Sequence, residues 1–191
     1  MSLSTAQRIA VFLGLALVMV ATRFHHFAAP DASWAVFFVA GFHLRGAARW
    51  AFPLLTALAV AVDIAVISGH GLDFWTHYCV SPAYWMLLPA YAVLWFGGSW
   101  LRSRHAGIGF ATLGRLALSL FVAVSLCYLI SNGSFYWLSP VVAERSFGGW
   151  LKNLGDWYAA FVGTTAAYVG IAATIHLVVA LALPAPVRAT R

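Results

Sequence analysis

The chain has 191 residues, of which 63% are hydrophobic and only 8% are charged, and its mean hydropathy is +0.87. A soluble domain carries about 25% charged residues, so this chain has too few to cover a surface that faces water. The composition therefore predicts an integral membrane protein, with a single domain over residues 1–191 that lies in a lipid bilayer. No glycine-rich phosphate loop occurs in the sequence, and we expect no nucleotide site in this chain. The net charge of +6 comes from basic residues scattered between apolar runs, a distribution that argues against a nucleic-acid partner.

Six apolar runs follow one another along the chain and predict an all-α bundle of six transmembrane helices. Pro53 falls in the first turn of the third run, where its missing N–H costs little, whereas Pro89 inside the fourth run is expected to kink that helix. The sixth run is longer than the roughly 20 residues a span needs, so we expect it to tilt. The predicted spans are 9–27, 33–44, 50–67, 82–101, 112–131 and 157–183.

The basic residues predict the orientation of these spans. If the N-terminus is cytoplasmic, eight of the 11 basic residues fall on the cytoplasmic side, and this excess places both termini inside. The acidic residues and most of the histidines fall on the opposite side, so the polar chemistry of the chain is expected to face outward. The outward acids are Asp31, Asp73, Glu144 and Asp156, and Asp63 lies in the outer half of the third predicted span.

The stretch GHGLDFWTHYCVSPAYWMLLP, residues 69–89, holds Cys79 between two apolar runs. Ser81 and Pro82 should open the fourth helix, and the dipole at a helix N-terminus favours a nearby thiolate. An unpaired cysteine is a liability in an oxidising compartment, which favours a ligand-binding thiol. An inert thiol and a disulfide with Cys127, in the fifth span, are the alternatives.

Other polar residues of this outer side have two interpretations each. His25 and His26 are adjacent and would point about 100° apart on a helix, so we expect one of them to face a cavity. His77 and Cys79 are expected to alternate in an extended loop, so that they could point the same way. Asp63, a carboxylate inside a span, either forms an ion pair with Arg23 or contacts a ligand.

The stretch SNGSFYW, which contains Asn132 and Tyr136, is expected to close the fifth span. Its amide and hydroxyl groups can donate and accept hydrogen bonds to a ligand. A helix C-cap with a left-handed residue at Asn132 or Gly133 is the alternative.

Four segments, ATRFHHF, PDASWAVFFVAGFHLR, CVSPAYWMLLPAYAVLWFGG and LISNGSFYW, occur in this order and resemble the BtuM family. These are small bacterial inner-membrane proteins related to the substrate-binding subunits of energy-coupling-factor vitamin transporters, and they are assigned to cobalamin uptake. The resemblance covers about Thr22 to His176 and implies a six-helix bundle like those subunits, with a cobalamin pocket open to the periplasm. It also implies an energy-coupling-factor module as a partner. Relatives that use this module dock it through an Ala-x-x-x-Ala pattern on the first helix. The nearest match here is Ala10-x-x-x-Gly14, so transport without the module stays open.

Position by position, the resemblance implies that Cys79 is the axial ligand of the cobalt in cobalamin. A thiolate is a soft donor that suits such a position, and its donation would weaken the opposite axial bond. Cyanocobalamin bound in this way could lose its cyanide with the help of an external thiol. The residues expected to line the ligand site are His25, His26, Asp31, Asp73, Trp75, His77, Tyr78, Ser81, Tyr84, Asn132 and Tyr136.

Two other classes of function fit the same residues. A transporter of nickel, cobalt or zinc ions would use His25, His26, Asp73, His77 and Cys79 together. A membrane thiol oxidoreductase would use Cys79 with Cys127, although the chain has no C-x-x-C motif.

Overall fold

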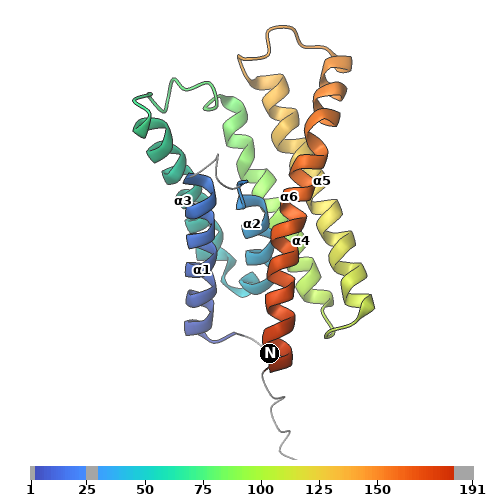
Figure 1. The fold of residues 1–191 in the computed structure, drawn as a ribbon. Helices are drawn as coiled ribbons and strands as arrows, with labels where there is room; N and C mark the ends of the chain where they lie inside the picture. Colours follow the sequence, from blue (N-terminus) through green and yellow to red (C-terminus); the bar gives the residue numbers. More distant parts are fainter. Residues whose placement is uncertain (1–2, 25–29, 183–191) are drawn as a thin grey trace, which may run out of the picture.

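The computed structural model describes residues 3–24 and 30–182 (Figure 1). These residues form helices and no strand, which confirms the predicted all-α class. The α-helices are α1 (Thr5–Phe24), α2 (Ser33–His43), α3 (Ala48–Gly69), α4 (Leu87–Arg104), α5 (Phe110–Leu138) and α6 (Phe147–Ala182). Two 3₁₀-helices, η1 (Arg45–Ala47) and η2 (Pro82–Met86), precede α3 and α4.

Four helical stretches of the described chain are long and apolar enough to cross a membrane. They are α1, η1 together with α3, α5 and α6, and their length and composition are consistent with the membrane protein that the composition predicts. The short helix α2 has 11 residues, which at 1.5 Å per residue reach about 16 Å, half of a hydrocarbon core of about 30 Å. Four of the six predicted spans are therefore long enough and apolar enough, while α2 and α4 are not among them.

Several predicted boundaries shift in the structure. α5 continues to Leu138, so Asn132 and Gly133 lie inside a helix, and no non-glycine residue among those described has a positive φ. The alternative prediction, a helix C-cap with a left-handed residue at Asn132 or Gly133, is therefore wrong. Pro89 lies in the first turn of α4 rather than in its interior, where its missing N–H leaves no hydrogen bond unmade, so the expected cause of a kink is absent.

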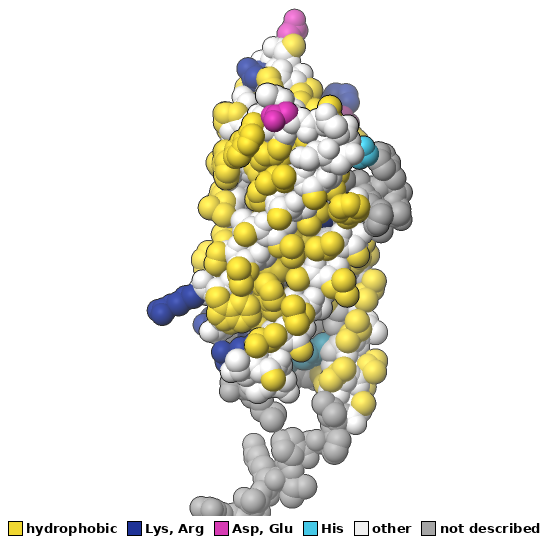
Figure 2. Space-filling view, turned by 90° about the vertical axis from the view of Figure 1, so that its left-hand side faces the viewer, with side chains coloured by type: hydrophobic (Ala, Val, Ile, Leu, Met, Phe, Trp, Pro, Cys, Tyr) yellow, Lys and Arg dark blue, Asp and Glu magenta, His cyan; other side chains and the backbone are white. Residues whose placement is uncertain are grey.

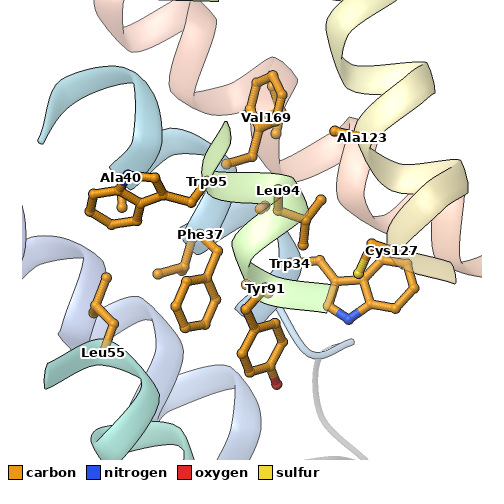
Figure 3. Packing of buried hydrophobic residues seen from close by; sticks show 14 of the residues in the cluster. Trp34, Phe37, Ala40, Leu55, Tyr91, Leu94, Trp95, Ala123, Cys127 and Val169 are labelled. Carbon is orange, nitrogen blue, oxygen red and sulfur yellow. The ribbon is translucent and has the colours of Figure 1, made fainter. Parts of the chain in front are cut away.

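The centre of the bundle is α2, the shortest α-helix. It packs against α1, α3, α4 and α6, and a helix surrounded in this way is apolar on all sides. Figure 3 shows Trp34 and Phe37 of α2 beside Tyr91, Leu94 and Trp95 of α4. The Phe37 and Tyr91 rings stack with centroids 4.2 Å apart. The segment 33–44, predicted as a span, is thus the core around which the longer helices pack.

Two glycines allow α2 and α4 to approach each other closely. A Cβ atom on Gly41 would collide with the backbone of Trp95, and one on Gly98 would collide with the carbonyl of Phe38. Small residues at such a crossing let two backbones meet, as is common between membrane helices.

We expect Gly98→Ala to destabilise the protein by about 1–3 kcal/mol, because the new methyl group forces α2 and α4 apart. The matched control is Gly14→Ala in α1, where a Cβ meets nothing within 4 Å and alanine favours the helix. Thermal melts in detergent measure both variants, and equal melting temperatures would contradict the role of this crossing.

The two ends of the bundle differ in charge. The start of α1 and the end of α6 lie together at the lower end in Figure 1, and the connections 70–81 and 139–146 lie at the upper end. On the face in Figure 2, acidic side chains appear only near the upper end. We call the upper end the acidic end, defined by Asp31, Asp73, Glu144 and Asp156. The opposite, arginine-rich end carries Arg8, Arg45, Arg49, Arg102, Arg104 and Arg115.

Candidate functional site

A buried ion network near the acidic end is built around Arg23, in the last turn of α1. Arg23 is 7% exposed, and its Nε and Nη2 donate to the two carboxylate oxygens of Asp63 in α3, both at 2.7 Å. Its Nη1 donates to Asp31 Oδ2 at 2.9 Å. The predicted ion pair between Arg23 and Asp63 is confirmed, and its two parallel hydrogen bonds are the strongest arrangement for such a pair.

Hydroxyl groups complete this network. Ser33 Oγ and the Tyr91 hydroxyl oxygen accept from Arg23 Nη1 at 3.0 and 3.3 Å, and the Tyr84 hydroxyl donates to Asp63 Oδ2 at 2.7 Å. The network thereby joins α1, α2, α3, η2 and α4. One cation faces two carboxylates, so it carries one net negative charge.

The loop 70–81 lies above this network as a series of turns rather than an extended strand. The N–H of His77 donates to the carbonyl of Phe74, and the N–H of Val80 donates to the carbonyl of His77. Phe74 is buried, and its ring meets the Tyr84 ring edge to face at 5.8 Å. Since Tyr84 binds Asp63, Phe74 fastens the loop to the ion network.

The turns change the geometry expected for His77 and Cys79. The backbone N–H of Cys79 donates to Nδ1 of His77 at 3.3 Å, so this ring nitrogen is already an acceptor within the loop. Asp73 Oδ1 likewise accepts from the backbone N–H of Thr76 at 3.0 Å. The expectation that His77 and Cys79 alternate in an extended loop is therefore wrong, because local hydrogen bonds fold it.

Cys79 is a free, half-buried cysteine. Burial raises the pKa of its thiol above the usual value, and the negative charge of Asp63 acts in the same direction. The hydrogen bond with the Tyr78 hydroxyl opposes this rise in the pKa of Cys79. The fourth helix begins at Pro82 as predicted, first as η2 and then as α4 from Leu87, but the raised pKa of Cys79 runs against the thiolate expected at this helix start.

A pocket of about 410 Å³ lies between the loop 70–81 and the segment 138–145. Trp75 and Tyr78 are largely exposed beside it, and Ser81 Oγ is buried without a hydrogen-bond partner. Of the predicted ligand-site residues, those that line this pocket are Trp75, His77, Tyr78 and Ser81. Asp31 and Tyr84 lie instead in the ion network, and Cys79 is in the same loop but not among the residues that line the pocket.

Asn132 and Tyr136 lie on α5, and Tyr136 contacts the start of α6. The Tyr136 hydroxyl donates to the carbonyl of Ser146 at 3.1 Å and accepts from its N–H at 3.2 Å, so it holds the α5–α6 connection. Asn132 Oδ1 and Trp150 Nε1 are buried without a hydrogen-bond partner, and buried polar atoms of this kind call for one. Trp150 was not predicted as a site residue, because its sequence position indicates only a membrane interface.

We expect Tyr136→Phe to lower stability by about 1–2 kcal/mol, because two hydrogen bonds to Ser146 are lost. If the role of Tyr136 is structural, the affinity for cobalamin, the ligand that the sequence resemblance implies, should stay within about twofold of wild type. Thermal melts and binding titrations on the same preparation separate the two effects. Lost affinity at unchanged stability would contradict this assignment and return Tyr136 to the ligand site.

The structure also bears on the alternative arrangements. Cys79 and Cys127 are both free, and Cys127 is fully buried in the core cluster, so the disulfide alternative is not present. Among the residues that the structure describes, no group of three or more His, Cys, Asp or Glu side chains could hold a metal ion. His25 and His26, which belong to the predicted ligand sets, lie outside the described residues.

The acidic end thus brings together a free thiol, exposed aromatic rings and buried polar atoms without partners above a fixed ion network. Exposed aromatic rings and buried polar atoms without partners are features of a ligand-binding surface. No protein-family model matches the chain, and no curated protein matches it.

Proposed function

We propose that the protein binds a corrinoid at its acidic end and carries it inward across the bacterial inner membrane, with both termini in the cytoplasm. The observation that supports this most directly is Cys79, a free and half-buried thiol at the acidic end. The resemblance of residues 22–176 to the BtuM family supplies the ligand class. The excess of arginine at the opposite end supports the orientation.

Binding begins at the metal of the corrinoid. With aquacobalamin, the Cys79 thiol loses its proton to solvent and its sulfur replaces the cobalt-bound water as an axial ligand. Trp75 and Tyr78 present aromatic surface to the flat ring. Ser81 Oγ and Asn132 Oδ1, which lack partners, can hydrogen-bond the amide arms of the corrin.

The corrinoid is larger than the pocket of about 410 Å³. Entry of the ligand therefore requires the loop 70–81 to move away from the segment 138–145. The loop is held by few buried contacts apart from Phe74, and segments of this kind open at low cost. The ion network under it stays in place because Arg23 is buried and each of its three guanidinium nitrogens donates a hydrogen bond.

Loss of cyanide from bound cyanocobalamin is part of this proposal, with an external thiol as the reductant. Two thiols form one disulfide and release two protons and two electrons. The electrons reduce two Co(III) centres to Co(II), and the two cyanide ions that leave take up the protons as hydrogen cyanide. Cys79 donates from the opposite axial position and weakens the cobalt–cyanide bond.

Growth of a cobalamin-requiring bacterium with this chain as its sole uptake route tests the proposed function. We expect growth on limiting vitamin with the wild-type chain and with Cys127→Ala, and no growth with Cys79→Ala. Equal growth with Cys79→Ala and wild type, at equal protein levels in the membrane, would refute a role for the thiol.

Absorbance spectra of the purified protein separate this proposal from the other functions. Mixed with cyanocobalamin and glutathione, the wild-type protein should lose the cyanide-bound spectrum, whereas Cys79→Ala should keep it. A transporter of nickel, cobalt or zinc ions would instead bind the free ion and leave the corrinoid spectrum unchanged. A thiol oxidoreductase would oxidise glutathione without any corrinoid.

A further inference from the structure

A second cavity, of about 660 Å³, lies at the arginine-rich end, far along the bundle from Cys79. It is bounded by α2, the α4–α5 connection, the start of α5 and the last third of α6. Its walls are mostly apolar, with Phe38, Leu113 and Val169 among them. Its size falls within the roughly 300–1,000 Å³ of small-molecule sites.

Three histidines from three separate elements form the polar side of this cavity. The His176 ring of α6 lies 5.6 Å from the ring of His43 and 5.7 Å from that of His105. The three do not form a group that could hold a metal ion. Nδ1 of His105 is buried without a hydrogen-bond partner. A buried polar atom of this kind calls for a partner, which a bound ligand can supply.

The surroundings of the His105 imidazole favour its neutral form. Burial lowers its pKa, and the nearby His176 and Arg102 lower it further. His105 lies outside the spanning helices, in the connection between α4 and α5. A neutral imidazole can donate to an ester carbonyl or a phosphate oxygen without contributing charge.

The charge around the cavity is positive. The Arg102 guanidinium lies 5.3 Å from the centre of the Phe42 ring, which lines the cavity. Arg115 Nη1 donates to the carbonyl of Arg104 at 2.8 Å across the α4–α5 connection. Arg102, Arg104 and Arg115 therefore lie around this connection. All five acids of the sequence lie elsewhere, at the acidic end or in the ion network below it.

We propose that this cavity binds one anionic phospholipid, with an acyl chain between α2, α5 and α6 and the headgroup phosphate against the arginines of the α4–α5 turn. Apolar walls suit an acyl chain, and a positive turn without acids selects an anionic over a zwitterionic headgroup. His105 then meets the glycerol ester region between chain and phosphate. This lipid site is independent of the corrinoid site proposed at the other end.

Thermal melts of the delipidated full-length chain in detergent test this site, with phosphatidylglycerol compared against phosphatidylcholine of the same acyl chains. At about 100-fold excess over the dissociation constant, phosphatidylglycerol should raise the melting temperature by about 5–10 °C. Phosphatidylcholine should produce less than about half of that rise. Equal shifts with the two lipids would overturn the proposal, because they would show binding of the chain without headgroup selection.

Two sets of variants locate the effect. Arg102→Gln/Arg115→Gln should lose most of the extra shift given by phosphatidylglycerol, whereas Arg45→Gln/Arg49→Gln, the same charge loss at the same end, should keep it. Gly170→Leu should abolish the shift with both lipids, because a Cβ at Gly170 has open space around it and a larger side chain there fills the cavity. If the two double variants behave alike, the arginine-rich end acts only through its total charge, and the specific site is refuted.

Discussion

Replacing Arg23 by methionine is expected to destabilise the protein by about 3–5 kcal/mol, a larger loss than we expect for Gly98→Ala or Tyr136→Phe. The guanidinium is 7% exposed and forms hydrogen bonds to Asp63, Asp31, Ser33 and Tyr91. Without it, two carboxylates remain close together in a poorly hydrated place with no cation between them. A thermal melt followed by tryptophan fluorescence measures the loss.

Two further variants show whether this loss comes from uncompensated charge. Asp63→Asn added to Arg23→Met should recover part of the stability, because it removes one of the two orphaned charges. Lys152→Met breaks an exposed pair with Asp156 in α6 and should cost about 0.5 kcal/mol or less. If Arg23→Met melted like Lys152→Met, the network would not be what fixes the acidic end.

The sequence predicts this network better than it predicts the rest of the site, for a physical reason. A charge within an apolar run is costly unless it is paired, and Arg23 and Asp63 fall at similar depths in the first and third predicted spans. Depth and opposite charge make this pair a candidate, and the packing of α1 against α3 decides between the pair and a ligand contact. Asp31 has no such constraint, and its place on Arg23 Nη1 depends on how the chain enters α2.

The features that were not predictable depend on tertiary packing. The 11 residues of α2 are mostly apolar and indicate a short span, but the close glycine contacts with α4 show that this helix is the buried centre. The turns around Cys79 depend on backbone hydrogen bonds and on the burial of Phe74, neither of which leaves a periodic pattern. Burial raises the pKa of the Cys79 thiol, and the helix-dipole argument from the sequence did not include this burial.

The role of Tyr136, on α5 at the acidic end, also depends on tertiary packing and was not predictable from the sequence. A tyrosine one turn beyond Asn132 fits a ligand pocket as well as it fits a loop anchor. The structure shows the contacts of a loop anchor: Gly149 leaves room for the hydroxyl, and the backbone of Ser146 takes part in both of its hydrogen bonds. Both residues are in the next helix or just before it, so the sequence around Tyr136 does not contain the answer.

Affinity for aquacobalamin is expected to rise with pH, by up to about tenfold per unit between about pH 6 and pH 7.5. Burial raises the pKa of the Cys79 thiol, so the unliganded protein carries the proton throughout this range. Cobalt takes only the deprotonated sulfur, and each binding event therefore releases one proton. The sign follows from mass action: lowering the proton concentration favours the bound state until the pH passes the thiol pKa.

Calorimetry in buffers of different ionisation enthalpy counts the released proton, and titrations across the pH range give the slope. Cys79→Ala should bind at least about 100-fold more weakly, since partners that only support a metal ligand already contribute 10–100-fold, and its affinity should not vary with pH. Cys127→Ala, which removes the other cysteine, should keep both the affinity and the slope of wild type. A wild-type affinity that is flat over this range, with no proton released, would mean that the sulfur of Cys79 does not bind the cobalt.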